Sequence, residues 1–210
     1  PVILVLLATG HSPLVALDWK TTEIQLKAGL GQEQAVGIFP FRNTHDQPVR
    51  ILSVSADCHC VAAKLEKEVY APGESGEIRA TFTFAGSVGR QIKNITVTSD
   101  DSAGKATILT LAVDIPEPVV VNPRFLFWPT GSLPVERSLE VIVTEPGQTA
   151  VGELECSNPF FSVRLQPEQA GRYRLLIKPA GTQQPAEATI RLNVTVAGRI
   201  QSYVIYAAVR

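Results

Sequence analysis

The sequence predicts an all-β fold built as two consecutive antiparallel β-sandwiches. Apolar and polar residues alternate at a period of two in most segments after residue 17. Gly and Pro number 15 each, which suits a chain with many turns. No segment has the period of an amphipathic helix. A hydrophobic fraction of 45% is enough for packed cores and excludes wholesale disorder.

The sequence opens on an apolar run, Val2–Ala8, followed by Gly10 and Pro13. Because it contains no Met, we expect it to begin partway into a longer chain. An apolar core, a helix-breaking stretch and a small residue match the later part of a secretory signal peptide, although the run could instead be a first β-strand. We expect residues 1–16 to be a signal-peptide remnant and the mature chain to begin near Leu17. No segment reaches the ~20 apolar residues of a spanning helix, so we expect no transmembrane segment in the mature chain.

Residues 17–116 are predicted to form the first sandwich. Its strand-like segments are rich in β-branched and aromatic residues, and Gly, Pro and Asp separate them. The predicted strands are 36–41, 49–54, 78–84, 92–97 and 106–113. The predicted turns are 46–48, 71–74, 86–89 and 100–104.

The segment Ile115-Pro116-Glu117-Pro118 is the predicted linker, because two prolines fix φ and remove two backbone donors. After it the pattern restarts, and residues 117–210 are predicted to form a second sandwich. Its predicted strands are 124–128, 138–144, 150–157, 160–166, 173–178, 188–196 and 200–209. Short strands at regular spacing with turn signals between them are typical of this architecture.

Charge excludes one large class of partner. The chain carries 19 basic and 20 acidic side chains, for a formal net charge of −1. Binding to a polyanion depends on clustered positive charge, so we expect no nucleic-acid partner.

Several short motifs follow one another in a fixed order in the first half of the chain. Phe39-Pro40-Phe41-Arg42-Asn43 comes first, and Asp57-Cys58-His59-Cys60-Val61 comes second. The segments 70–76, 89–93 and 95–99 follow. In order and spacing these motifs resemble those of a bacterial family, domain of unknown function 1573.

This resemblance implies an exported, immunoglobulin-like β-sandwich with no assigned activity, similar in style to the sandwich modules of sperm and cilia-associated proteins. It covers about the first half of the mature chain. The family's box reads Cys-Gly-Cys-Thr, whereas here His59 stands in place of Gly and Val61 in place of Thr. Because the family has no assigned activity, the resemblance bears on fold and compartment far more than on function. For the whole chain we expect two consecutive immunoglobulin-like domains after the truncated signal peptide.

The sequence contains no pattern typical of an enzyme. Nucleophilic catalysis needs a nucleophile, a base and a group that orients the base. After the predicted signal peptide the histidines are His45 and His59, and the sequence has no Gly-x-Ser-x-Gly, phosphate loop or dinucleotide fingerprint. We therefore predict that the protein is not an enzyme.

The cluster Cys58-His59-Cys60 is the candidate site. In an extended strand, residues two apart share a face with Cα atoms ~6.5–7 Å apart. A disulfide needs Cβ atoms at ~3.5–4.5 Å, so pairing these cysteines requires a bulge or a tight turn. Two thiolates could instead bind a soft ion such as Cu(I), with His59 as a third ligand if the backbone turns its imidazole inward. Two interpretations stay open: structural cysteines, buried or joined in a turn disulfide, and a metal or redox site formed by Cys58, Cys60 and His59.

Six aromatic residues allow two interpretations, carbohydrate binding or packing. We predict packing, because aromatic side chains supply much of the buried area of sandwiches. Phe125 and Phe127 share one strand face close to the linker, which favours a role at the domain interface. Exposed paired aromatic side chains would instead favour carbohydrate. The six residues are Trp19, Phe125, Phe127, Trp128, Phe160 and Phe161.

These observations predict a non-catalytic exported protein, periplasmic or secreted. It would act in interaction, assembly or scaffolding with a protein partner in the cell envelope, and without a resident cofactor. The alternative is a periplasmic copper-binding or thiol-redox protein that works through Cys58 and Cys60. A hydrolase is a distant third.

Overall fold

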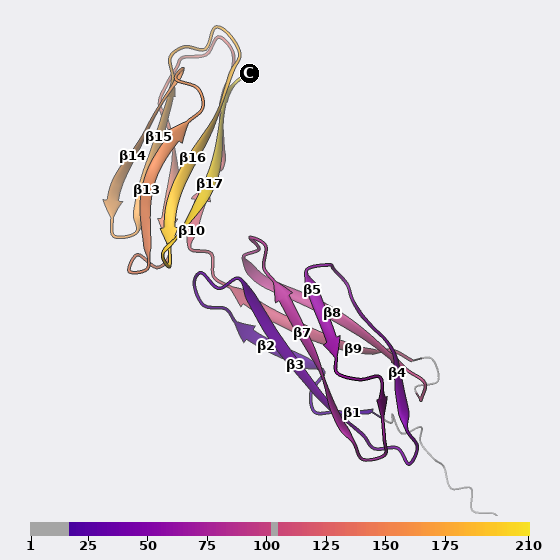
Figure 1. Ribbon diagram of the computed structural model, residues 1–210. Helices are drawn as coiled ribbons and strands as arrows, with labels where there is room; N and C mark the ends of the chain where they lie inside the picture. Colours follow the sequence, from indigo (N-terminus) through magenta and orange to yellow (C-terminus); the bar gives the residue numbers. More distant parts are fainter. Residues whose placement is uncertain (1–16, 102–104) are drawn as a thin grey trace, which may run out of the picture. The chain divides into compact units, whose positions relative to one another are not determined.

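The computed structural model describes residues 17–101 and 105–210 (Figure 1). The predicted signal-peptide remnant, residues 1–16, and residues 102–104 of a predicted turn lie outside this range. The described residues form seventeen strands and no helix, which confirms the all-β prediction. They therefore include no apolar helix long enough to cross a membrane.

The described chain divides into two compact units. Unit 1 contains residues 17–28, 32–101 and 105–115, and unit 2 contains residues 29–31 and 116–210. Unit 1 has two sheets, with strand orders β1-β3-β7-β5 and β2-β9-β8-β4-β6. All its strand pairs are antiparallel except β2 with β9, which is parallel. Its strands are β1 (Leu17–Trp19), β2 (Glu23–Lys27), β3 (Gln34–Asn43), β4 (Val49–Ala56), β5 (Val61–Leu65), β6 (Val69–Tyr70), β7 (Ser75–Thr83), β8 (Gly89–Ser99) and β9 (Thr107–Ile115).

The core of unit 1 lies between its two sheets and follows from the period of two. Along β3 every second residue is turned inward, so Phe39 and Phe41 are buried while Val36 and Ile38 are partly exposed. The opposite sheet contributes residues such as Leu109, which is fully buried. Each such side chain contributes about 1.5–3 kcal/mol by leaving water.

Unit 2 also has two sheets, with strand orders β10-β12-β15-β14 and β11-β17-β16-β13. Its strands pair antiparallel except β11 with β17, which is parallel. Trp128 is the largest fully buried side chain of its core. The strands are β10 (Val119–Asn122), β11 (Phe125–Trp128), β12 (Arg137–Val143), β13 (Thr149–Cys156), β14 (Phe161–Gln169), β15 (Arg172–Pro179), β16 (Ala186–Val196) and β17 (Arg199–Val209).

The two units share one topology. Strands β1, β2, β3, β4, β5, β7, β8 and β9 of unit 1 have the same order and directions as β10, β11, β12, β13, β14, β15, β16 and β17 of unit 2. Only the two-residue strand β6 lacks a counterpart. Each position in one unit can therefore be compared with the equivalent position in the other.

All twelve predicted strands are present, with ends shifted by a few residues. The structure adds five strands that the sequence pattern did not predict: β1, β2, β5, β6 and β10. All five are at most five residues long, so few alternations of apolar and polar residues mark them.

Candidate functional site

The Cys58-His59-Cys60 cluster lies where the chain of unit 1 leaves one sheet for the other. Strand β4 belongs to the sheet β2-β9-β8-β4-β6, and β5 belongs to the sheet β1-β3-β7-β5. Residues 57–60 connect them, and we call residues 57–61 the crossover turn. Because only four residues connect the two sheets, the backbone must turn sharply here.

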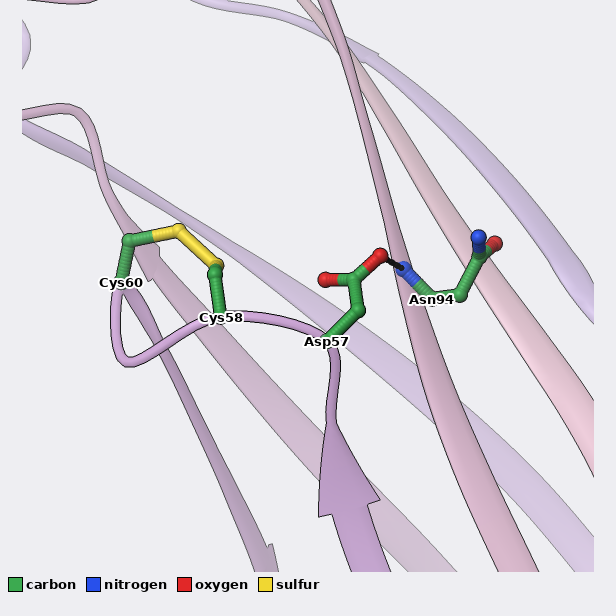
Figure 2. Close-up of a disulfide and its surroundings, with 4 residues drawn as sticks. All are labelled: Asp57, Cys58, Cys60 and Asn94. Carbon is green, nitrogen blue, oxygen red and sulfur yellow. Dashed lines mark hydrogen bonds between the residues drawn. A yellow bond between two sulfur atoms is a disulfide. The ribbon is translucent and has the colours of Figure 1, made fainter.

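Cys58 and Cys60 are joined by a disulfide in this turn (Figure 2). Their Cα atoms are 5.2 Å apart, closer than the ~6.5–7 Å of an extended strand. The backbone N–H of Val61 donates to the carbonyl of Cys58 at 3.3 Å, which closes a β-turn around His59 and Cys60. The sequence left two interpretations open, structural cysteines or a metal or redox site. The structure shows the cysteines joined by a disulfide in a tight turn.

The crossover turn is fixed to both sheets. The backbone N–H of Thr83, at the end of β7, donates to the carbonyl of Cys60 at 2.9 Å. On the other side, the N–H of Asp57 donates to the carbonyl of Asn94 in β8 at 3.1 Å. The carboxylate of Asp57 accepts a hydrogen bond from the N–H of Asn94 at 3.0 Å, as Figure 2 shows. Asp57 thus continues the pairing of β4 with β8 by one residue beyond the strand end.

The predicted metal ligands do not form a metal site in this oxidised form. A disulfide offers no thiolate, and thiolate is the form of cysteine that binds metal. His59 is exposed at the tip of the turn, while Cys58 and Cys60 are partly buried against the core. Within residues 17–101 and 105–210, no group of three or more His, Cys, Asp or Glu side chains could hold a metal ion. Cu(I) binding by Cys58, Cys60 and His59 therefore stays a prediction for the reduced protein.

His45 lies at the other end of β4 from the crossover turn. Its Nδ1 accepts a hydrogen bond from the N–H of Gln47 at 3.3 Å and lies 3.3 Å from a carboxylate oxygen of Asp46. The eight residues of β4 separate it from the disulfide by roughly 25 Å. The structure therefore does not bring His45 and the cysteines together.

Unit 2 forms the same crossover between β13 and β14 without a disulfide. The N–H of Ser157 donates to the carbonyl of Thr189 at 3.0 Å, and the Ser157 hydroxyl accepts from the N–H of Thr189 at 2.9 Å. The N–H of Phe161 donates to the carbonyl of Asn158 at 3.1 Å. The amide oxygen of Asn158 accepts from the N–H of Phe160 at 3.0 Å, where unit 1 has the bond between Cys58 and Cys60. An asparagine turn and a disulfide therefore hold equivalent backbones.

Cys156, the third cysteine, is free and partly buried at the end of β13. Its thiol lies 3.3 Å from the carbonyl oxygen of Asn158 and packs against the core of unit 2. It fits the description of a small hydrophobic side chain with a weak donor.

Two of the other family-like motifs of unit 1, residues 39–43 and 70–76, meet at Asn43. This side chain is fully buried, and its amide donates to the carbonyls of Gln47 and Tyr70 at 2.9 Å each. Its amide oxygen accepts from the N–H of His45 at 2.9 Å. Tyr70 packs edge-on against Phe41, with ring centroids 4.8 Å apart. These motif residues thus hold two loops of the sandwich together and are structural.

Four of the six aromatic residues pack as predicted. Trp128 and Phe161 are buried in the core of unit 2. Trp19 packs against Phe41 at 4.9 Å between ring centroids, and Phe160 packs against Phe161 at 5.6 Å. In contrast, Phe125 and Phe127 are 42% and 48% exposed.

Sequence reasoning missed Asp57 and Asn94 as determinants of the crossover turn. A signal existed for Asp57, because Asp commonly bonds nearby backbone groups in turns. The role of Asn94 depends on the pairing of β4 with β8, which no local pattern reveals.

Several solved structures are similar to this chain at low sequence identity. A protein of unknown function from Porphyromonas gingivalis W83 is 12% identical, with a TM-score of 0.34 over 92% of this chain and 98% of that one. The YadV chaperone is 12% identical, with a TM-score of 0.35 over 91% of this chain and 99% of its own. The periplasmic chaperone SfaE is 11% identical, with a TM-score of 0.38 over 91% and 98%.

Among curated proteins, none matches the sequence of this chain. Residues 17–115 match a family described as "Protein of unknown function (DUF1573)". The matched range runs from the first residue of β1 to the last residue of β9 and contains both the Asn43 motif and the Cys58-His59-Cys60 box. The first half of this chain, from Leu17 to Ile115, therefore belongs to the DUF1573 family of proteins of unknown function.

Proposed function

We propose that this protein is a non-catalytic interaction module of the cell envelope, exported to the periplasm or secreted, and that it binds a protein partner through an open strand edge. The observation that carries the proposal is strand β14. This nine-residue strand pairs with β15 on one side and has no neighbouring strand on the other among the described residues. An open edge offers backbone donors and acceptors to a partner strand.

The hydrogen-bond pattern identifies which residues of β14 face the open edge. The N–H of Ala180 donates to the carbonyl of Phe160, which fixes the alternation of the antiparallel ladder. By that alternation, Ser162 and Arg164 direct their backbone groups toward β15. Val163 and Leu165 direct theirs toward the open edge. A partner strand would therefore pair with the backbone of Val163 and Leu165.

The disulfide supports the exported location in this proposal. Disulfides form and persist in oxidising compartments such as the periplasm and the extracellular space. The bond between Cys58 and Cys60 lies in a partly exposed turn, within reach of cytoplasmic reductants if the protein stayed in the cytoplasm.

The placement of the histidines supports a role without catalysis. His45 and His59 lie in different loops of unit 1, at opposite ends of β4, and both are exposed. Neither has a Ser, Cys or Thr nucleophile among the hydrogen-bond partners described above, as a nucleophile–base pair requires.

A photo-crosslinking amino acid placed at Gln166 in living cells tests the edge. Gln166 is exposed on β14 next to Leu165, so a partner strand on the edge should be captured. The control position is Ser138, which is exposed on the inner strand β12 of the same sheet. We expect a defined adduct from Gln166 and none from Ser138. No adduct from Gln166, or the same adducts from both positions, would contradict the proposal.

A second candidate is thiol redox exchange, which the partly exposed Cys58–Cys60 disulfide favours. In this reaction two external thiols are oxidised to a disulfide, while the bond between Cys58 and Cys60 is reduced to two thiols. Equilibration with glutathione buffers, followed by mass spectrometry of alkylated protein, tests it. A pair that is partly reduced across the glutathione range supports exchange, and one that stays fully oxidised throughout contradicts it.

A further inference from the structure

A hollow lies on the outer face of the sheet β11-β17-β16-β13 in unit 2. Its floor is Ala208, whose side chain points outward from β17 but is only 2% exposed because larger neighbours surround it. By the strand register, Ala208 lies between Phe127 on β11 and Glu187 on β16. Tyr206 and Arg210 precede and follow it on the same face of the chain. The hollow has a volume of about 250 Å³.

Aromatic rings form one wall of the hollow. Phe125 on β11 is the direct neighbour of Tyr206 on β17, and they are 42% and 52% exposed. Phe125 stacks on Phe127, with ring centroids 6.1 Å apart and planes 18° from parallel. The guanidinium carbon of Arg210 lies 5.7 Å from the centroid of Phe125. These contacts hold the rings in place in the absence of a ligand, which lowers the entropic cost of binding.

Polar groups complete the lining of the hollow. The guanidinium of Arg210 pairs with the carboxylate of Glu187 at 2.9 Å, and both side chains are about two-thirds exposed. The hydroxyl of Ser157 accepts the N–H of Thr189, so its own proton is available to donate. Donors and acceptors therefore stand close to an apolar wall. Because the two charges neutralise each other, the hollow favours an uncharged ligand.

Unit 1 shows that the fold does not require this arrangement. The equivalent positions follow from the matching registers of β2, β9 and β8. Ala112 occupies the place of Ala208, and it too is buried on an outer face. Glu23 occupies the place of Phe125, and Thr110 occupies the place of Tyr206. The same sheet therefore forms with polar side chains where unit 2 exposes two aromatic rings, so the rings of unit 2 are not explained by folding.

We infer that the hollow around Ala208 is a binding site for one sugar ring of a neutral carbohydrate. A pyranose has an apolar face of C–H groups, which suits the wall of Phe125 and Tyr206. It has hydroxyl groups around its rim, each able to donate and accept, which suits Glu187, Arg210 and Ser157. This site goes beyond the protein-binding edge of β14, because it lies on the other sheet of the unit and takes a different class of ligand.

Two features favour a sugar over a peptide. A protein interface of ordinary stability buries about 1,200–2,000 Å² in total, whereas the hollow is a local depression of about 250 Å³. A sugar ring would also offer several hydroxyl groups at once to the carboxylate of Glu187 and the guanidinium of Arg210, whereas a peptide side chain offers few.

Saturation-transfer NMR on the full chain tests the site. The probes are the methyl pyranosides of glucose, galactose, mannose and N-acetylglucosamine at millimolar concentration. We expect saturation transfer to the C–H protons of at least one pyranoside. Tyr206→Thr copies the residue of unit 1 and removes the ring, and Ala208→Leu fills the hollow. Each should weaken binding by roughly tenfold or more.

Ile200→Ala is the matched control, because Ile200 is an exposed apolar residue on the same strand, outside the hollow. It should bind as the unsubstituted protein does, and circular dichroism should show all three variants folded. The inference is overturned if no pyranoside receives saturation. It is overturned equally if Tyr206→Thr and Ala208→Leu bind as well as Ile200→Ala, or if a tripeptide containing Leu binds the hollow and the pyranosides do not.

Discussion

Asp57 and Ser157 occupy equivalent positions in the two units and hold their crossover turns by the same two contacts. Each donates its backbone N–H to the carbonyl of a residue on the neighbouring strand, Asn94 or Thr189. Each also accepts the N–H of that residue on its side-chain oxygen. A carboxylate and a hydroxyl thus perform one structural task. The turns differ in the next position, where unit 1 has a cysteine and unit 2 an asparagine.

The disulfide should contribute little to stability. Cys58 and Cys60 close a ring of three residues, for which the loss of unfolded-state entropy gives about 1.5 kcal/mol. We therefore expect Cys58→Ser/Cys60→Ser to lower the free energy of unfolding of unit 1 by about that amount, measured by denaturant titration.

Asn158→Ala provides the comparison in unit 2. It removes the hydrogen bonds of the Asn158 side chain to the N–H of Phe160 and to the carbonyl of Glu187, with an expected loss of about 1–2 kcal/mol. A loss of about 4 kcal/mol or more in the cysteine variant would show that the disulfide does more than hold the turn.

Reduction should determine whether the cysteine pair binds copper. In a Cu(I) competition titration, the oxidised protein should not bind through Cys58 and Cys60, because it has no thiolate there. If the reduced pair is a metal site, its affinity should fall as the pH falls, since binding releases thiol protons. The control is Cys58→Ser/Cys60→Ser. Equal affinity in the reduced protein and the variant, or none in either, would end the copper hypothesis.

Asn43 should be among the most sensitive positions in unit 1. Asn43→Ala leaves the buried carbonyl of Tyr70 and the N–H of His45 without their side-chain partner. Each stranded group costs about 1–3 kcal/mol, so we expect a loss of about 2–5 kcal/mol in denaturant titration. Gln47→Ala is the control, because the bond from Asn43 goes to the backbone of Gln47 and is kept. A change below about 1 kcal/mol for Asn43→Ala would contradict this account.

Two tyrosines should make the protein sensitive to alkali. Burial is the largest cause that raises the pKa of Tyr70 above its ordinary value of 10.0. Burial, together with the charge of Glu117, also raises the pKa of Tyr203. The unfolded chain therefore loses these protons first. The stability that depends on the neutral phenols is complete below about pH 10 and declines as the pH rises above it.

Denaturant titrations between neutral pH and pH 11 test this dependence. Tyr70→Phe and Tyr203→Phe should each flatten the alkaline decline. Tyr206→Phe serves as the control, since Tyr206 is 52% exposed. An alkaline decline that is identical in all three variants would contradict the assignment.

The fold could be predicted from the sequence wherever a strand was long enough to alternate several times. Strands such as β8 and β16, of eleven residues each, display the pattern clearly. Strand β10 reads Val-Val-Val-Asn. Val119 and Val121 are buried and Val120 faces outward, but all three are apolar, so the sequence shows no alternation of apolar and polar residues. Strand β5 contains two alanines, which carry little preference for strand.

The site was harder to predict for a physical reason. The residue spacing showed that the cysteines need a turn in order to pair, but the turn itself depends on a change of sheet after Ala56. The shared face of Phe125 and Phe127 follows from the strand period. Tyr206 joins them through the parallel register of β11 and β17, two strands about eighty residues apart in the chain, and no local pattern encodes that register.

The proline near the end of β14 bears on how the protein behaves when it is concentrated. An edge strand that can accept a foreign strand can also accept the same strand of another copy, and repeated addition leads to fibres. Pro167 pairs with Tyr173 in the same alternation as Val163 and Leu165, so its ring nitrogen faces the open side and offers no hydrogen. A strand that adds to this edge therefore loses one backbone hydrogen bond at Pro167. The edge on the N-terminal side of Pro167 stays open to a partner strand.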